Sequence, residues 1–170
     1  MVEVTTRDGP EAPTLGLAFP GLTGLDDDTN AALAKALADC GYAPADGAGL
    51  ADVRLTGIGH ASIRRDLRLA LEAVLRQTAR PLGPASCRLG DLVPARAELL
   101  DALLPASACG PRLAAMLRRN GCSRWSELLD RTLAELDEWH GVGPAGLAEL
   151  VGMCFEQSLA GLAVDDVHPA

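Results

Sequence analysis

Aromatic side chains are scarce in this sequence, which has two Trp, two Phe and one Tyr among its 170 residues. A core must then be filled by Leu, Ala and Val, which suits small helical bundles better than β-sandwiches. Lysine is also rare, since Lys35 is the single one and the other basic residues are Arg. Such heavy use of Ala, Leu, Gly and Arg is typical of GC-rich coding, so the Arg excess alone does not indicate nucleic-acid chemistry.

Paired cysteines, long apolar runs and a secretory signal are also missing. The five cysteines stand singly, with no Cys-x-x-Cys spacing, which favours free thiols over a disulfide framework or a zinc site. No apolar run reaches the length that spans a bilayer. The first residues lack the positive region and apolar stretch of a signal peptide. We therefore expect a cytoplasmic protein with no membrane partner, no metal and no cofactor.

No catalytic constellation is recognisable. The three histidines lie far apart without a His-Glu-x-x-His spacing, and Ser62 has no nucleophile-elbow context. The glycines from Gly141 onward are not followed by the Lys-Ser/Thr of a phosphate-binding loop. The Asp triplet at residues 26–28 suits a helix cap better than a metal site, because consecutive carboxylates splay apart. We predict that the chain is not an enzyme.

Charge is unevenly distributed along a chain whose net charge is -8. Residues 1–56 and 132–170 are acidic, whereas residues 57–131 contain twelve basic and seven acidic side chains. The overall charge argues against a simple basic nucleic-acid binder, because attraction to phosphate supplies most non-specific affinity. A local basic surface in the middle of the chain is still compatible with this pattern.

Apolar residues recur at helical spacing in several runs separated by Gly and Pro, which predicts an all-α protein. We expect five segments, which are an extended, flexible N-terminal arm over residues 1–24, a helical unit over 25–80, a linker with a short helix over 81–110, a second helical unit over 111–162 and a flexible tail over 163–170. Asp26 to Thr29 can cap the first long helix, and Gly41 can end it. Thr132 and Glu135 have the spacing of a capping box.

The two helical units share sequence patterns. Leu33 to Gly41 aligns with Leu113 to Gly121, and a Gly-Ile-Gly at Gly57 to Gly59 corresponds to a Gly-Val-Gly at Gly141 to Gly143 after a four-residue shift. Leu/Ala-rich helices imitate one another easily, so both a true duplication and a chance likeness stay open.

A Gly-hydrophobic-Gly turn between helices can grip a phosphate backbone. The glycines let the backbone approach a ligand closely, and the following helix presents open N–H groups and the positive end of its dipole. This helix-hairpin-helix arrangement positions nucleic acid without reading its sequence. The same turn can also serve only to pack two helices together.

Residues Arg112 to Leu162 resemble the C-terminal domain of the bacterial RNA polymerase alpha subunit. The likeness rests on a leading helix that ends in Leu117-Arg-Arg-Asn-Gly121-Cys122, a helix near Ser126 to Thr132, a short helix, the second hairpin and a final helix. It covers roughly the last third of the chain. It implies a compact helical domain that binds upstream promoter DNA through the minor groove and docks transcription factors.

The family's DNA-contacting positions are only partly retained. The resemblance places contacts at Arg112, Arg118, Gly141 and Gly143. The family's Asn in the leading helix is replaced by Ala115, and its Lys-Ser pair after the glycines by Ala145 and Gly146. The first hairpin carries more polar and basic groups, and its candidate residues are Gly57, Gly59, His60, Ser62, Arg64, Arg65 and Arg68.

These patterns predict a non-catalytic DNA-associated or transcription-associated module that contacts the phosphate backbone through a helix-hairpin-helix. The alternative is a protein-interaction adaptor that keeps the fold without binding DNA, or a regulatory domain of a larger assembly. DNA binding requires Arg64, Arg65 and Arg68 to share an exposed face with the hairpin N–H groups. An adaptor requires a contiguous exposed apolar patch.

Overall fold

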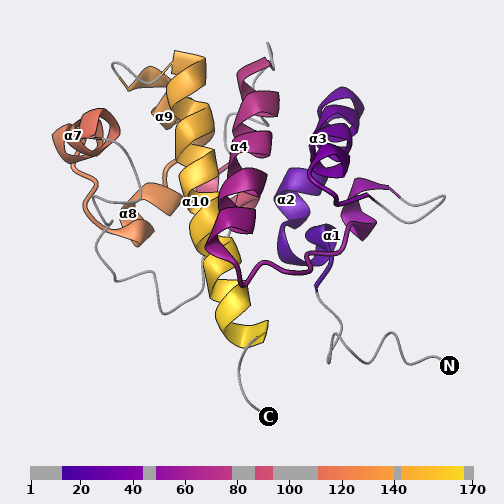
Figure 1. The fold of residues 1–170 in the computed structure, drawn as a ribbon. Helices are drawn as coiled ribbons and strands as arrows, with labels where there is room; N and C mark the ends of the chain where they lie inside the picture. The colour runs from indigo at the N-terminus through magenta and orange to yellow at the C-terminus, as the bar shows by residue number, and fades with distance from the viewer. Residues whose placement is uncertain (1–12, 44–48, 78–86, 94–110, 140–142, 167–170) are drawn as a thin grey trace, which may run out of the picture.

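The computed structural model describes residues 13–43, 49–77, 87–93, 111–139 and 143–166 (Figure 1). Their elements are α1 (Leu15–Ala18), α2 (Pro20–Thr23), α3 (Asp27–Asp39), the 3-10 turn η2 (Leu50–Asp52), α4 (Ala61–Gln77), α5 (Leu89–Leu92), α7 (Pro111–Arg119), α8 (Trp125–Leu129), α9 (Leu133–Glu138) and α10 (Gly143–Asp166). These ranges contain isolated β-bridges but no sheet, so the predicted all-α class is confirmed. Within them, no helix combines the length and apolarity needed to cross a bilayer.

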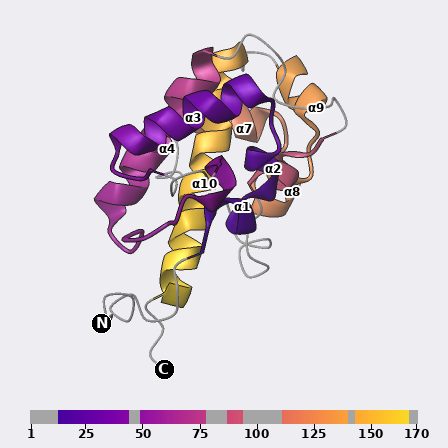
Figure 2. The same ribbon diagram turned by 90° about the vertical axis from the view of Figure 1, so that its right-hand side faces the viewer.

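α4 and α10 lie side by side at the centre of the molecule and run in opposite directions (Figures 1 and 2). Arg68 of α4 pairs with Glu156 of α10. Glu72, which is one turn after Arg68 in α4, faces Gly152, which is one turn before Glu156 in α10, so the two helices are antiparallel. The apolar stripes of the two helices are buried and consist of Leu67, Leu71, Leu75, Val151, Phe155 and Leu159. This antiparallel pair holds the two parts of the chain together.

A buried carboxylate lies at this helix pair. The side chain of Glu72 is 5 % exposed and accepts from Arg68 Nε at 2.6 Å and from Arg76 at 3.2 Å. Arg68 also reaches across to Glu156 at 2.8 Å. Burial by itself lowers the pKa of Arg68, but its hydrogen bonds to Glu156 and Glu72 raise it overall, so the guanidinium stays charged. The network satisfies the buried charge and ties α4 to α10.

The helices α3 and α7 end in the same way. Gly41 and Gly121 follow them with φ of +94° and +78°, the left-handed conformation that glycine adopts without strain. The next amide donates to the carbonyl five residues earlier, from Tyr42 to Leu37 at 2.8 Å and from Cys122 to Leu117 at 2.9 Å. These are Schellman-type ends, and they confirm the glycine stop predicted after each helix.

Isolated antiparallel bridges extend this correspondence. Thr14 pairs with Arg54, and Arg88 pairs with Thr132. The flanking bonds match, since Leu15 N–H donates to Val53 C=O at 2.7 Å, Leu55 to Pro13 at 2.9 Å, Leu89 to Arg131 at 2.9 Å and Leu133 to Cys87 at 2.8 Å. The described residues of 13–77 and of 87–166 therefore share an order of elements, in which α1 corresponds to α5, α3 to α7, η2 to α8 and α4 to α10. α2 and α9 have no counterpart among the described residues.

The repeat places two glycines in equivalent tight contacts. A Cβ on Gly16 would lie 3.0 Å from Ala51 Cα, and a Cβ on Gly90 would lie 3.1 Å from the carbonyl oxygen of Leu129. Each glycine thus lets a short helix approach the turn that precedes its bridge. Each half consequently begins earlier than the predicted helical unit, because α1 and α5 are bonded into it.

The prediction of an extended N-terminal arm is wrong for the described residues of that segment. α1 and α2 form there instead, and Leu15, Phe19 and Leu22 are each 1 % exposed. The Phe19 ring packs on Phe155 of α10 with 4.8 Å between ring centroids. The apolar run of this segment is too short to show a helical or strand periodicity, so its conformation depends on the surface against which it packs and could not be predicted locally.

Two further boundaries differ from the prediction. α5 lies inside the segment predicted as a linker, and its Leu89 and Leu92 are buried in the core. The short helix expected at Ala95 to Leu104 lies outside the described residues. α10 continues to Asp166, so the predicted flexible tail is helical as far as that residue.

The arginine network generates a stability prediction. We expect Arg68→Ala to lower the free energy of unfolding by about 2–3 kcal/mol, because it leaves the buried Glu72 with one cationic partner and removes the link to Glu156. Arg65→Ala, an exposed position on the same helix, should change it by less than about 0.5 kcal/mol. Urea unfolding followed by circular dichroism measures both. Equal losses in the two variants would contradict a special role for Arg68.

Candidate nucleic-acid interface

The first hairpin is anchored by its central side chain and exposes its backbone. Ile58 is 0 % exposed, whereas Gly57 and Gly59 lie at the surface. Gly57 has φ +75°, which disfavours any side chain there. The Tyr42 hydroxyl donates to the carbonyl of Thr56 at 2.5 Å, and burial raises the pKa of that hydroxyl. These contacts hold the turn in one conformation.

The hairpin leads directly into the first turn of α4. The carbonyl of His60 accepts from Ile63 N–H at 3.1 Å and from Arg64 N–H at 3.2 Å, which starts the helix. Among the described residues, no backbone carbonyl accepts from the amides of Gly59, Ala61 or Ser62. Open amides at the positive end of a helix dipole favour an anion.

The three arginines of α4 have different surroundings. Arg64 donates to the carbonyl of Ile58 at 2.6 Å and thereby closes the hairpin onto the helix. Arg65 is exposed, and Arg68 is held by Glu72 and Glu156. The expected common exposed face of these arginines is therefore not formed. Arg65 is the arginine of this group that is directed to the surface.

The structure brings together part of the predicted nucleic-acid-binding set. We use the name hairpin surface for five exposed residues around the turn, which are Gly57, Gly59, His60, Ser62 and Arg65. Arg112 and Arg118 are exposed on α7, which lies on the far side of α10 from α4 (Figure 1). Gly141 lies outside the described residues, and Gly143 is the first residue of α10.

The apolar surface expected of an adaptor is also limited. The large hydrophobic side chains that are exposed among the described residues are Leu17, at 78 %, and Leu69, at 50 %. They lie on α1 and α4. Single exposed apolar residues are common on protein surfaces and do not by themselves define a docking patch.

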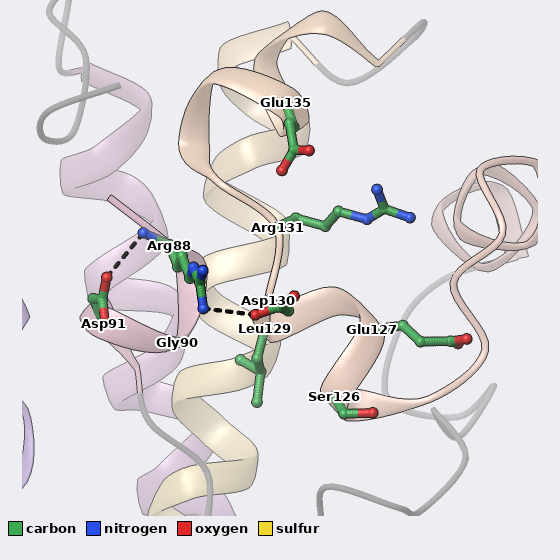
Figure 3. Close-up of a pocket in the computed structure, with 9 residues that line it drawn as sticks. All are labelled: Arg88, Gly90, Asp91, Ser126, Glu127, Leu129, Asp130, Arg131 and Glu135. Carbon is green, nitrogen blue, oxygen red and sulfur yellow. Dashed lines mark hydrogen bonds and ion pairs between the residues drawn. The ribbon is translucent and has the colours of Figure 1, made fainter. Parts of the chain in front are cut away.

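A surface groove of about 720 Å³ runs between α5 and α8 (Figure 3). Its lining consists of Arg88, Gly90, Asp91, Ser126, Glu127, Leu129, Asp130, Arg131 and Glu135. Arg88 pairs with Asp130 at 2.8 Å, and Arg131 lies over the Trp139 ring, 5.7 Å from its centroid. Both guanidinium groups therefore have partners within the protein.

The acids of the groove serve as helix caps. Glu127 accepts from the N–H groups of Ser123 at 2.8 Å and Arg124 at 2.9 Å. Glu135 accepts from Thr132 N–H at 2.8 Å, and the Thr132 hydroxyl accepts from Glu135 N–H at 3.2 Å. The predicted capping box is thus confirmed.

The described residues include possible metal ligands and free thiols. Among them, no three His, Cys, Asp or Glu side chains gather closely enough to hold a metal ion. Cys122 and Cys154 are buried free thiols, and burial raises the pKa of both, which disfavours the reactive thiolate.

No protein-family model, curated protein or solved structure matches this chain. The resemblance to the polymerase alpha C-terminal domain therefore remains a prediction.

Sequence reasoning missed the structural roles of Arg64 and Arg68. The role of Arg68 could have been predicted from the sequence. Glu72 is four residues from both Arg68 and Arg76, and side chains at this spacing in a helix form ion pairs. The bond from Arg64 to Ile58 depends on how the hairpin folds back, and no local pattern encodes it.

The two capping carboxylates generate a pH prediction. Backbone hydrogen bonds from Ser123 and Arg124 lower the pKa of Glu127, and one from Thr132 lowers the pKa of Glu135. A carboxyl whose pKa is lowered by folding stabilises the fold above its unfolded pKa, and this stabilisation disappears as pH falls through the folded value. We expect Glu127→Gln/Glu135→Gln to lower the Tm at about pH 7 and to leave it nearly unchanged at about pH 2.

Thermal scans across this pH range measure the effect. Glu138→Gln, at the end of α9, provides a control that removes one carboxylate without removing a cap. A Tm difference for the double variant that is equally large at both pH values would rule out the capping mechanism.

Proposed function

We propose that this protein is a non-catalytic DNA-associated module that contacts the phosphate backbone through the hairpin surface. The observation that supports this most is the combination of a buried Ile58 with exposed glycines and an outward Arg65 beside the open amides of α4. Backbone amides and one arginine can bind phosphate oxygens but cannot distinguish bases. The contact would therefore be independent of sequence.

The same surface implies weak binding. Arg64 and Arg68 are engaged within the protein, so Arg65 is the guanidinium best placed to approach a phosphate. The net charge of -8 opposes approach to a polyanion at low salt. We infer a module that assists a larger assembly on DNA, where other subunits supply most of the affinity.

A protein-interaction adaptor is the second candidate. Leu17 is the observation that bears on it, because this leucine is 78 % exposed on a short helix and offers a partner apolar area to cover, although one such residue does not define a docking patch. The pairing of Arg68 with Glu72 and Glu156 also favours an adaptor, because it leaves fewer cations that could contact phosphate. A regulatory domain within a larger complex would use the same surface.

A salt titration of binding to short duplex and single-stranded DNA tests the first proposal. We expect measurable binding at low salt, and a log–log salt slope that Arg65→Ala flattens by about one unit, because one phosphate contact is lost. Lys35→Ala, an exposed cation on α3, is the matched control and should leave the slope unchanged. Arg112→Ala/Arg118→Ala tests the second predicted surface separately.

Arg64→Ala has a different expected effect. Its guanidinium bonds to the hairpin rather than to solvent, so the variant should weaken binding through a less ordered turn and also lower the Tm. Absence of DNA binding by the wild-type protein at low salt would exclude the hairpin model and leave the adaptor as the function to pursue.

A further inference from the structure

The corresponding helices α3 and α7 carry opposite charge. Residues 111–126, which include α7, contain four arginines and no acidic residue. Residues 26–39, which include α3, contain four aspartates and one lysine. Because the two helices have the same Schellman-type end and the same place in the repeat, the difference lies in their side chains rather than in their backbone.

Both sets of charges lie on the surface. The basic face consists of Arg112, Arg118 and Arg119, all exposed on α7, and Arg112 and Arg119 are seven residues apart and so share one side of the helix. The acidic face consists of Asp27, Asp28 and Asp39, all exposed on α3, and it also includes the exposed Lys35, which lies on the same side of the helix between Asp28 and Asp39. Among the described residues, no ion pair involves Arg118, Arg119, Asp27 or Asp39.

The two faces lie at opposite sides of the molecule. α7 and α3 are separated by the central α10 and α4 (Figure 1). One copy therefore cannot neutralise its basic face with its own acidic face. A contact between different faces of two copies is heterologous, and it continues from copy to copy unless the rotation closes a ring.

We propose that the basic face on α7 docks onto the acidic face on α3 of a second copy of this chain, in a head-to-tail arrangement. The chain itself supplies the complementary surface, because the arginines of α7 and the aspartates of α3 are both exposed. Ala115 on α7 and Ala31 on α3 lie between the charged positions and allow the helices to approach closely.

Such an interface is weak when formed by two copies alone. Exposed ion pairs contribute about 0.2–1 kcal/mol each and are screened by salt. We expect concentration-dependent assembly, with an apparent Kd that rises roughly tenfold between about 0.05 M and 0.5 M salt. Repeated copies on a common scaffold would strengthen the contact through effective concentration.

Reciprocal charge reversal tests the proposal in the full chain by sedimentation velocity. Asp27→Lys/Asp39→Lys makes both faces basic, and Arg118→Glu/Arg119→Glu makes both acidic. Each variant alone should be monomeric at a concentration where the wild type assembles. An equimolar mixture of the two should assemble again, because each reversed face then meets an opposite charge on the other variant.

Arg65→Glu, outside both faces, is the control and should assemble like the wild type. Circular dichroism verifies that each variant is folded, since charges near helix ends also act on the helix dipole. A monomeric wild type at low salt and high concentration would overturn the proposal. So would a mixture of folded variants that stays monomeric, or loss of DNA binding in the Arg variant without any change in assembly.

Discussion

The fold depends on the packing of α4 against α10. This contact buries the apolar stripes of both halves and also encloses Glu72, a carboxylate that a purely apolar interface would not admit. Gly152 makes this possible, because a Cβ there would lie 2.6 Å from Glu72 Cγ. The arginines around Glu72 then fix which turn of α4 meets which turn of α10. The ion pair between Arg68 and Glu156 and the close fit of Glu72 on Gly152 thus specify the register in addition to the apolar matching.

The packing of α4 against α10 also determines which arginines near the first hairpin stay accessible to a ligand. Arg68, which sequence alone assigns to nucleic acid, is needed at the helix contact, and Arg64 is needed to close the turn. What remains at the surface is a rigid backbone with one outward cation. Rigidity lowers the entropy lost on binding, so a small surface of this kind suits a contact that other components strengthen.

The helical class, the Asp26 cap, the glycine stops and the Thr132 capping box could be predicted because each depends on residues within one turn of each other. The positions of α1 and α5 could not, because the bridges that hold them join Thr14 to Arg54 and Arg88 to Thr132 across dozens of residues. The exposure of the side chains at the candidate site could not be predicted from the sequence either. Whether an arginine faces water or a carboxylate on another helix is decided by tertiary packing.

The antiparallel pairing of equivalent helices also determines how the molecule unfolds. The buried apolar side chains of the described residues form one cluster across both halves, in which α4 packs against α10 as well as against α3. Separating them would expose both stripes to water at once. The described halves therefore form one cooperative unit, and a substitution in α3 or α7 is transmitted to the opposite half through the stability they share.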